Sequence, residues 1–295
     1  MGIFIEIIFR SLEYGSIYAL AALSIILVYR TSNITNFAQG VLAMFNTYVV
    51  ATAVNKYGIP IYGAVVIGIV SAIVVGILID IIIIRNAKKV SPVGKQIITL
   101  GIMAIILGAA PFIFGYYDLS LPKFFPNGSL TIIGAQLSYN AIFNISLGVV
   151  IMLALFYVIQ RTKWGLAIRT TASNEVTARL MGVPTKTVTM LSWAIAGALS
   201  VLAGTMTAPF SNVSLTFMND VQIIALLACV LGGFQTFHGP VLGAYIISIS
   251  LNLITFYMRV PDGTVWGKPL IYLLILLFLV VRPNGLIGKK LVKKV

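Results

Sequence analysis

The sequence predicts an all-α polytopic membrane protein with about eight or nine transmembrane helices. Of its 295 residues, 59% are hydrophobic and only 9% are charged, whereas soluble domains carry roughly 25% charged residues. So few charges could not cover a globule of this size in water. A membrane-spanning helix needs about 20 mainly apolar residues, and the chain contains a succession of such runs. We therefore expect one transmembrane domain over residues 1–295.

The expected membrane helices correspond to nine apolar runs. They cover residues 7–29, 39–54, 59–84, 96–117, 141–160, 188–209, 221–237, 240–258 and 269–281. The second run contains Asn46, the stretch 232–240 (GGFQTFHGP) divides the seventh from the eighth, and the last run is short. We therefore expect broken or re-entrant segments near 33–54 and 221–240. Nine crossings, or eight with one re-entrant piece, agree equally well with the sequence.

The distribution of lysine and arginine predicts the orientation. These residues gather in 85–95, 161–187 and the C-terminal tail, whereas 118–140 contains only Lys123 and 210–220 contains none. Basic residues concentrate in cytoplasmic loops, so the first three segments and the C-terminus are expected to be cytoplasmic. Counting back through the runs places the N-terminus outside. The net charge of +13 is thus a topology signal, and we expect no nucleic-acid binding.

Several kinds of chemistry are disfavoured by what the apolar runs contain. The single cysteine, Cys229, excludes a disulfide within the chain, and the single histidine, His238, cannot build a metal site alone. Glu13 lies about one turn from Arg10, and Asp80 lies near the inner end of its run. An ion-coupled carrier usually has a carboxylate near mid-membrane. Neither acid lies at the centre of an expected span, which disfavours such a carrier. The spans also lack the paired acids or Ser/His sets of an enzyme.

The loop between the fifth and sixth runs is expected to contain a short helix. Ser173 or Asn174 can cap it, and Glu175 in the first turn complements the helix dipole. Gly182 and then Pro184 end it.

One face of this short helix is expected to be apolar. Ala178, Leu180 and Met181 supply that face, and Arg179 remains polar. Docking into a groove on a soluble partner and lying on the membrane surface are both compatible with this pattern.

Polar and small residues interrupt the apolar runs at two places. Asn36, Gln39 and Asn46 fall on one general side of the second run, and amides in a bilayer need partners. They either satisfy a break between helices or line a translocation pathway. Near residue 232, glycines and a proline break a second helix, and His238 is expected in a loop. Glycines at helix-packing spacing let membrane helices approach closely; these are Gly197, Gly204, Gly239 and Gly243.

The short sequence TARLMG, residues 177–182, is similar to the coupling-helix motif Ala-Ala-x-x-x-Gly of ABC importer permeases, with Thr177 in place of the first alanine. Five longer stretches occur in the order found in one family of these permeases: GSIYALAALSIILVYRTSNITNFAQG, GLAIRTTASNEVTARLMGV, AIAGALSVLAGTMTAP, VLGGFQTFHGPVLGA and VRPNGLIGKK. Over nearly all of its length, the chain resembles the permease subunits of high-affinity branched-chain amino acid ABC importers. Importers of urea, short amides or other amino acids use similar permeases, so such an importer stays an alternative. An ion-coupled carrier is a less favoured alternative.

This resemblance implies a multi-pass transport subunit in the inner membrane of a prokaryote, without an ATPase site of its own. Its implied partners are two cytoplasmic ABC ATPases, a sister permease, an extracytoplasmic substrate-binding protein and membrane lipid. ATP and Mg²⁺ would bind the partner subunits, since this chain has no G-x-x-x-x-G-K-[ST] loop. The resemblance also implies a cytoplasmic coupling loop over 161–187. The residues expected to contact the ATPase are Arg169, Glu175, Ala178, Arg179, Leu180, Met181 and Gly182. The residues proposed for a translocation pathway or gate are Asn36, Phe37, Gln39, Asn46, Gly232 and Gly233.

Overall fold

The computed structural model describes residues 2–87, 90–132, 135–258 and 263–287. In chain order its elements are α1 (Gly2–Ser32), α2 (Gln39–Tyr57), α3 (Ile61–Leu78), the π-helix η1 (Ile79–Ile84), α4 (Pro92–Phe114), β1 (Ser129–Ile132), β2 (Ala135–Ser138), α5 (Tyr139–Arg161), α6 (Lys163–Ser173), α7 (Glu175–Leu180), α8 (Thr185–Ser211), α9 (Asn219–Gly232), α10 (His238–Tyr257) and α11 (Gly263–Val281). The all-α polytopic fold is confirmed.

Each of the nine apolar runs forms a helix of the membrane domain. Within the described residues, six helices are long and apolar enough to cross a bilayer, namely α1, α3 continued by η1, α4, α5, α8 and α10. The apolar helices α9 and α11 are shorter, and α2 is less apolar. The chain is broken between α1 and α2 and again between α9 and α10, as the sequence predicts.

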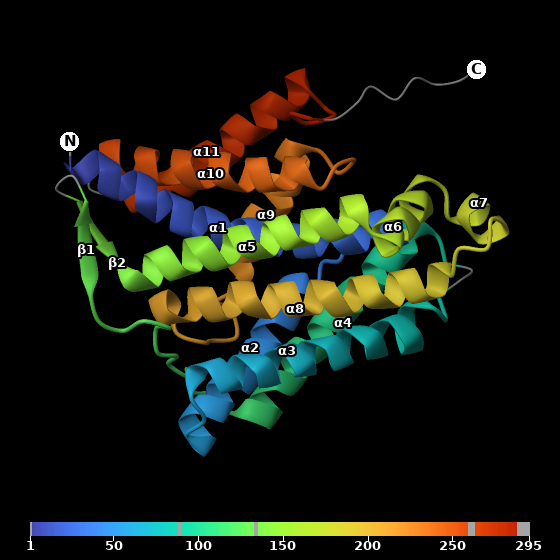
Figure 1. Cartoon of the computed structure of the whole chain (residues 1–295), viewed down its shortest axis with the longest axis horizontal. Coiled ribbons are helices and arrows are strands. Elements are labelled where there is room, and N and C mark those ends of the chain that lie inside the picture. Colours follow the sequence, from blue (N-terminus) through green and yellow to red (C-terminus); the bar gives the residue numbers. More distant parts are fainter. Residues whose placement is uncertain (1, 88–89, 133–134, 259–262, 288–295) are drawn as a thin grey trace.

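The long helices lie side by side, with α1 in the middle of the bundle (Figure 1). α1 packs against α5, α8, α9 and α10. Its residues from Gly15 to Val28 are all buried, which is the pattern of a helix enclosed on every side. By contrast, α3, α5 and α11 carry exposed apolar side chains, including Val70, Val150 and Leu274. These helices form the surface suited to lipid.

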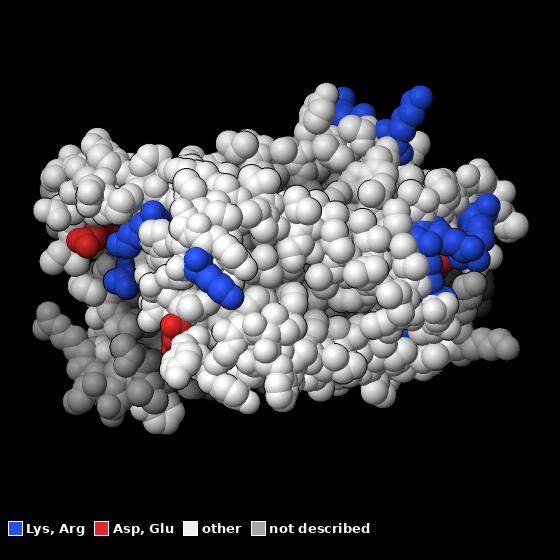
Figure 2. Space-filling model, turned by 90° about the horizontal axis from the view of Figure 1, so that it is seen from below, with Lys and Arg blue, Asp and Glu red and all other residues white. Residues whose placement is uncertain are grey.

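The two ends of the bundle differ. α6 and α7 lie at one end, and the β1–β2 hairpin lies at the other (Figure 1). We call the first the basic end, defined by Arg85, Lys163, Arg169, Arg179 and Lys186. Figure 2 shows charged side chains toward both ends of the visible face and an uncharged middle. Lys88, Lys89 and the lysines of the tail at 288–295 lie outside the described residues.

Three features depart from the sequence-based expectation. The segment expected as an outer loop contains the antiparallel hairpin β1–β2, and the basic loop contains two helices, α6 and α7, where one was expected. His238 is the first residue of α10 rather than a loop residue. Its ring stacks on Phe156 of α5 at 4.3 Å between centroids, a contact between distant parts of the chain.

Glycines permit the closest helix contacts. A Cβ added at Gly197 of α8 would lie 2.6 Å from the carbonyl oxygen of Ala72 in α3, and one added at Gly243 of α10 would lie 2.5 Å from that of Ala228 in α9. Added carbons at Gly204 and Gly239 would meet Thr47 and Gly232, respectively. All four glycines expected at packing sites therefore lie against a neighbouring element.

Replacement of Gly197 by alanine is expected to destabilise the protein. The new methyl group would push α8 from α3, and overpacking of this kind costs about 1–3 kcal/mol. Gly101→Ala in α4 is the matched control, because nothing lies within 4 Å of its added Cβ. Thermal unfolding in detergent should show a lower Tm for Gly197→Ala only. Equal Tm values for the two variants would contradict the close α3–α8 contact.

Candidate functional site

The start of α7 is fixed by a side-chain cap. Asn174 Oδ1 accepts a hydrogen bond from the backbone N–H of Thr177 at 3.0 Å, which satisfies one of the unpaired donors at a helix N-terminus. Of the two capping residues that the sequence allows, the structure uses Asn174, because Ser173 is the last residue of α6. Glu175 is the first residue of α7.

The end of α7 is a Schellman turn. The N–H of Gly182 bonds to the carbonyl of Arg179 at 3.1 Å, and the N–H of Val183 bonds to that of Ala178 at 3.0 Å. Gly182 has a φ of +82°, a conformation that costs other L-residues roughly 1–2 kcal/mol. The six-residue helix thus has defined ends, although it is too short to be stable alone.

The outward face of α7 differs from the predicted one. Ala178 is buried against the protein, whereas Leu180 is 83% exposed and Met181 is 65% exposed. Residues two apart on a helix point in nearly opposite directions, so Ala178 cannot share a face with Leu180. Val176, which is 70% exposed, does share it. Its i, i+4 spacing to Leu180 is the signal that could have identified it.

The charged residues around α7 form local contacts. Arg179 Nη2 lies 2.6 Å from Glu175 Oε1, and both side chains are largely exposed, so this pair contributes little to stability. Arg169 lies on α6, where its Nη2 is 3.4 Å from the carbonyl oxygen of Gln160. The structure therefore brings Glu175 and Arg179 together and directs Arg169 toward the end of α5.

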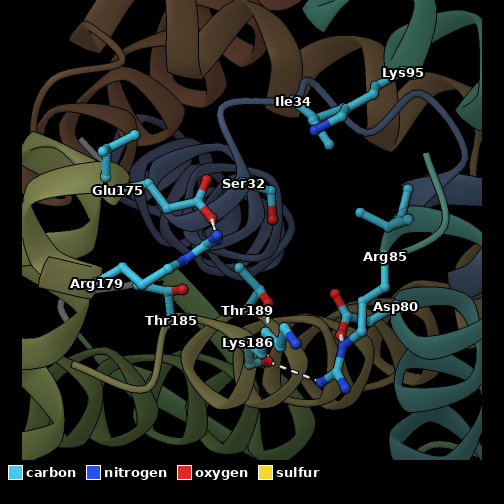
Figure 3. A pocket seen from close by; sticks show the side chains of 12 residues that line it. Ser32, Ile34, Asp80, Arg85, Lys95, Glu175, Arg179, Thr185, Lys186 and Thr189 are labelled. Atoms are coloured by element: carbon cyan, nitrogen blue, oxygen red, sulfur yellow. Dashed lines mark hydrogen bonds and ion pairs between the residues drawn. The ribbon is translucent and has the colours of Figure 1, made fainter. Parts of the chain in front are cut away.

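A cavity of about 430 Å³ lies beside α7 at the basic end. α7, the first turns of α8, η1, the end of α1 and the start of α4 all contribute to its wall (Figure 3). Asp80 is buried there, and its Oδ2 pairs with Arg85 Nε at 3.0 Å. Arg85 also donates from Nη2 to the carbonyl oxygen of Lys186 at 2.9 Å. The arginine thus connects the end of η1 to the start of α8, directly after the α7 turn.

A second polar cluster lies at the break between α1 and α2. Asn36 Oδ1 accepts from the N–H of Ala38 at 3.0 Å, and Asn36 Nδ2 donates to Gln39 Oε1 at 2.7 Å. Gln39 Nε2 in turn donates to the carbonyl oxygen of Ala196 in α8 at 3.0 Å. Asn36 and Gln39 are both buried. Their amides satisfy each other and the interrupted backbone.

Gln222 of α9 completes this cluster and was not identified from the sequence. Its Oε1 accepts from the N–H of Gly40 at 2.9 Å, and its Nε2 donates to the carbonyl oxygen of Phe37 at 2.5 Å. The N–H of Phe37 is 3.2 Å from Thr99 Oγ1 in α4. The amide of Gln222 therefore bonds to the backbone on both sides of the turn that begins α2. A single glutamine in an apolar helix is only a weak indication of a buried polar contact. The sequence does not show its partner Gly40, which lies 182 residues away.

No pathway wide enough for an amino acid opens at these amides in the described structure. The two cavities that Gln39 lines measure about 10 Å³ each, which is about the space that one water molecule needs. Asn46 lines one of them, and its Oδ1 accepts from Ser71 Oγ at 2.8 Å.

Gly232 and Gly233 lie where the end of α9 meets the C-terminal segment. The N–H groups of Leu286 and Ile287 bond to the carbonyls of Leu231 and Gly232 at 2.8 and 3.3 Å. Gly233 has a φ of +95°. The chain after α11 thus satisfies two carbonyls that would otherwise lack partners at the end of α9.

Glu13 does not pair with Arg10 in the structure. Its Oε1 accepts from Asn144 Nδ2 of α5 at 2.7 Å, and the Arg10 guanidinium lies 5.9 Å from the centre of the Tyr14 ring. In the part of the chain that the structure describes, no three His, Cys, Asp or Glu side chains come together as a metal site would require.

Comparison with known proteins reveals similarity along almost the entire chain. The family model described as "Branched-chain amino acid transport system / permease component" matches residues 7–280. A probable branched-chain amino acid transport permease protein LivH of Methanocaldococcus jannaschii is 31% identical over 93% of this chain and 90% of its own. The high-affinity branched-chain amino acid transport system permease protein LivH of Escherichia coli K12 is 29% identical over 99% of this chain and 98% of its own.

Among solved structures, PsaBC from Streptococcus pneumoniae in complex with Fab aligns with a TM-score of 0.48 and 14% identity, over 92% of this chain and 94% of that one. The family model covers far more than half of the residues, and the relatives align over nearly their whole lengths. This chain belongs to the family of permease components of branched-chain amino acid transport systems.

Proposed function

We propose that this chain is the permease subunit of an ATP-driven importer of leucine, isoleucine and valine, and that α7 transmits ATPase movement to it. One observation carries the coupling role. The helix presents Val176, Leu180 and Met181 outward at the basic end. An exposed apolar helix face with fixed ends is suited to a groove on a soluble protein. The relatives' names support the substrate class.

The basic end is then the cytoplasmic end, in accordance with the positive-inside rule, and the basic tail predicts a cytoplasmic C-terminus by the same rule. Two ABC ATPases holding ATP and Mg²⁺ would bind at this end. A substrate-binding protein would deliver solute at the hairpin end, and a sister permease would complete the membrane part. The coupling loop comprises residues 161–187 within one transmembrane domain, and the membrane is the inner membrane of a prokaryote.

The arrangement at the basic end gives a route for coupling. α7 is joined to α8 through the turn at Gly182, and Arg85 connects the first turn of α8 to η1. A push on Leu180 would therefore move α8 and α3 together. Arg169, Glu175, Ala178 and Arg179 would support the contact from α6 and α7.

The break between α1 and α2 is proposed as the gate region. Asn36, Phe37 and Gln39 hold the turn there against α8 and α9, and Asn46 lies further along α2. The second break, at Gly232 and Gly233, would move with it. Movement of α8 would act on the gate through the bond from Gln39 to the carbonyl of Ala196.

The experiment that tests the coupling role is co-purification from the native membrane in mild detergent, followed by an ATPase assay. We expect stoichiometric recovery of an ATP-hydrolysing partner. Solute uptake into vesicles by an ATPase-free preparation would refute the proposal and favour an ion-coupled carrier.

Substitution of Leu180 by aspartate is expected to remove most of the bound ATPase. A buried hot-spot contact of this kind is worth about 2 kcal/mol or more, which corresponds to at least a tenfold loss of affinity. Leu130→Asp is the matched control, because Leu130 is also exposed but lies on β1. Co-purification at equal protein yield is the measurement. A comparable loss with Leu130→Asp would show that the effect is not local to α7.

Gly182→Val is expected to reduce ATPase coupling because valine disfavours the positive φ that ends α7. Gly58, with a φ of +64°, ends α2, and like Gly182 it has nothing within 4 Å of an added Cβ. Gly58→Val thus imposes similar backbone strain away from α7. We expect substrate-stimulated ATPase activity to fall with Gly182→Val and to persist with Gly58→Val. Equal activities for these two variants would contradict a specific role for this turn.

Gln222→Leu is expected to impair transport while the ATPase stays bound. The substitution removes both amide bonds to the α2 turn and leaves the N–H of Gly40 and the carbonyl of Phe37 unpaired, at about 1–3 kcal/mol each. Gln136→Leu on β2 is the control, since Gln136 is exposed. Uptake into proteoliposomes and co-purification should be measured together. Unchanged uptake by Gln222→Leu would exclude the α1–α2 break from the gate.

A further inference from the structure

The cavity beside α7 contains two polar atoms that the described protein leaves without partners. Asp80 is 1% exposed; Arg85 binds its Oδ2, whereas Oδ1 has no hydrogen bond. Ser32 Oγ is likewise buried without a partner. Both residues line the same cavity. An unsatisfied buried carboxylate oxygen is costly, so a ligand that donates hydrogen bonds would be favoured there.

The same cavity has two lysines with no counter-ion in the described part of the chain. Lys95 of α4 and Lys186 of α8 both line it, and they approach it from different sides (Figure 3). The two acidic residues in the wall, Asp80 and Glu175, already pair with arginines. The lysine ammonium groups are therefore available to an anionic group.

The rest of the wall includes aliphatic side chains. Ile34 is 1% exposed, Ile84 is 7% exposed, and Val176 contributes from α7. A volume of about 430 Å³ lies within the range of small-molecule sites, about 300–1,000 Å³. The cavity thus combines two cationic groups, one unpaired carboxylate oxygen and an apolar surface.

These groups together select a zwitterion with an aliphatic part. A simple anion would pair with the two lysines but would leave Asp80 Oδ1 without a partner. A simple cation would satisfy Asp80 but would face Lys95 and Lys186. A molecule with both a carboxylate and an ammonium group satisfies the whole set.

We propose that this cavity binds a free aliphatic α-amino acid at the basic end. Its carboxylate would lie between Lys95 and Lys186, and its ammonium group would donate to Asp80 Oδ1 and Ser32 Oγ. The inference rests on the proposed function, in which the basic end is the side to which amino acids are delivered. Its polar contacts would join α1, η1, α4 and α8 beside α7, and so the delivered solute would act next to the coupling site.

The test is equilibrium binding of radiolabelled L-leucine to the purified full-length chain in nanodiscs, without binding protein or ATP. We expect saturable binding that valine displaces. The double variant Lys95→Gln/Lys186→Gln should weaken binding at least tenfold, because it removes two charge-assisted hydrogen bonds. Lys56→Gln, at the hairpin end of α2, should not change it. Ser32→Ala, which leaves the Asp80–Arg85 pair intact, should weaken it by several-fold.

Two leucine analogues test the zwitterion directly. L-leucinol lacks the carboxylate and 4-methylpentanoate lacks the ammonium group, and both should bind at least tenfold more weakly than leucine. Equal binding of 4-methylpentanoate, or displacement of leucine by millimolar inorganic phosphate, would identify a plain anion site and overturn the proposal.

Failure of the amino acid site and failure of the permease function give different results. If leucine does not bind, or binds unchanged in the double lysine variant with an unaltered Tm, the proposed amino acid site is wrong. Co-purification of an ATPase in the same preparation would then leave the permease function standing.

Discussion

Where a membrane helix stops inside the molecule, its free N–H and C=O groups need partners from the protein, because the lipid interior offers none. This chain meets that requirement twice with residues distant in sequence. At the start of α2, the amides of Asn36, Gln39 and Gln222 bind the interrupted backbone and reach α8. At the end of α9, the backbone of Leu286 and Ile287 takes the free carbonyls. Both breaks are thereby hydrogen-bonded to distant parts of the chain, the first to α8 and α9 and the second to the segment after α11.

The rest of the bundle is organised around the enclosed helix α1. A helix buried on all sides needs neighbours on all sides, and α5, α8, α9 and α10 supply them. Close approach between other pairs relies on glycine rather than on large apolar side chains, as at Gly197 and Gly243. This matters in lipid, where helix association depends on packing more than on the hydrophobic effect. α3, α5 and α11 then present their apolar side chains outward.

The basic end shows how a short helix can be held in place by local contacts. α7 has only six residues, yet an asparagine cap, a Schellman turn and the burial of Ala178 define its position. The exposed side chains of Val176, Leu180 and Met181 are thereby presented in a fixed orientation. Directly beneath them, Arg85 links η1 to α8 beside a polar cavity. A surface suited to a partner and a cavity suited to a small molecule thus share one wall.

The sequence by itself determined the membrane class, the positions of the nine apolar helices, the two breaks and the short helix near residue 175. Those features depend on local hydropathy, charge and capping chemistry, which neighbouring residues encode. Tertiary structure alone decided which residues face outward on α7, where Ala178 turns in and Val176 turns out, and which distant residue satisfies the break at α2. It also decided that Glu13 pairs with Asn144, and that η1 and the β1–β2 hairpin form. Each of these depends on what lies opposite in the folded bundle, and a linear pattern of apolar and polar residues carries no record of that partner.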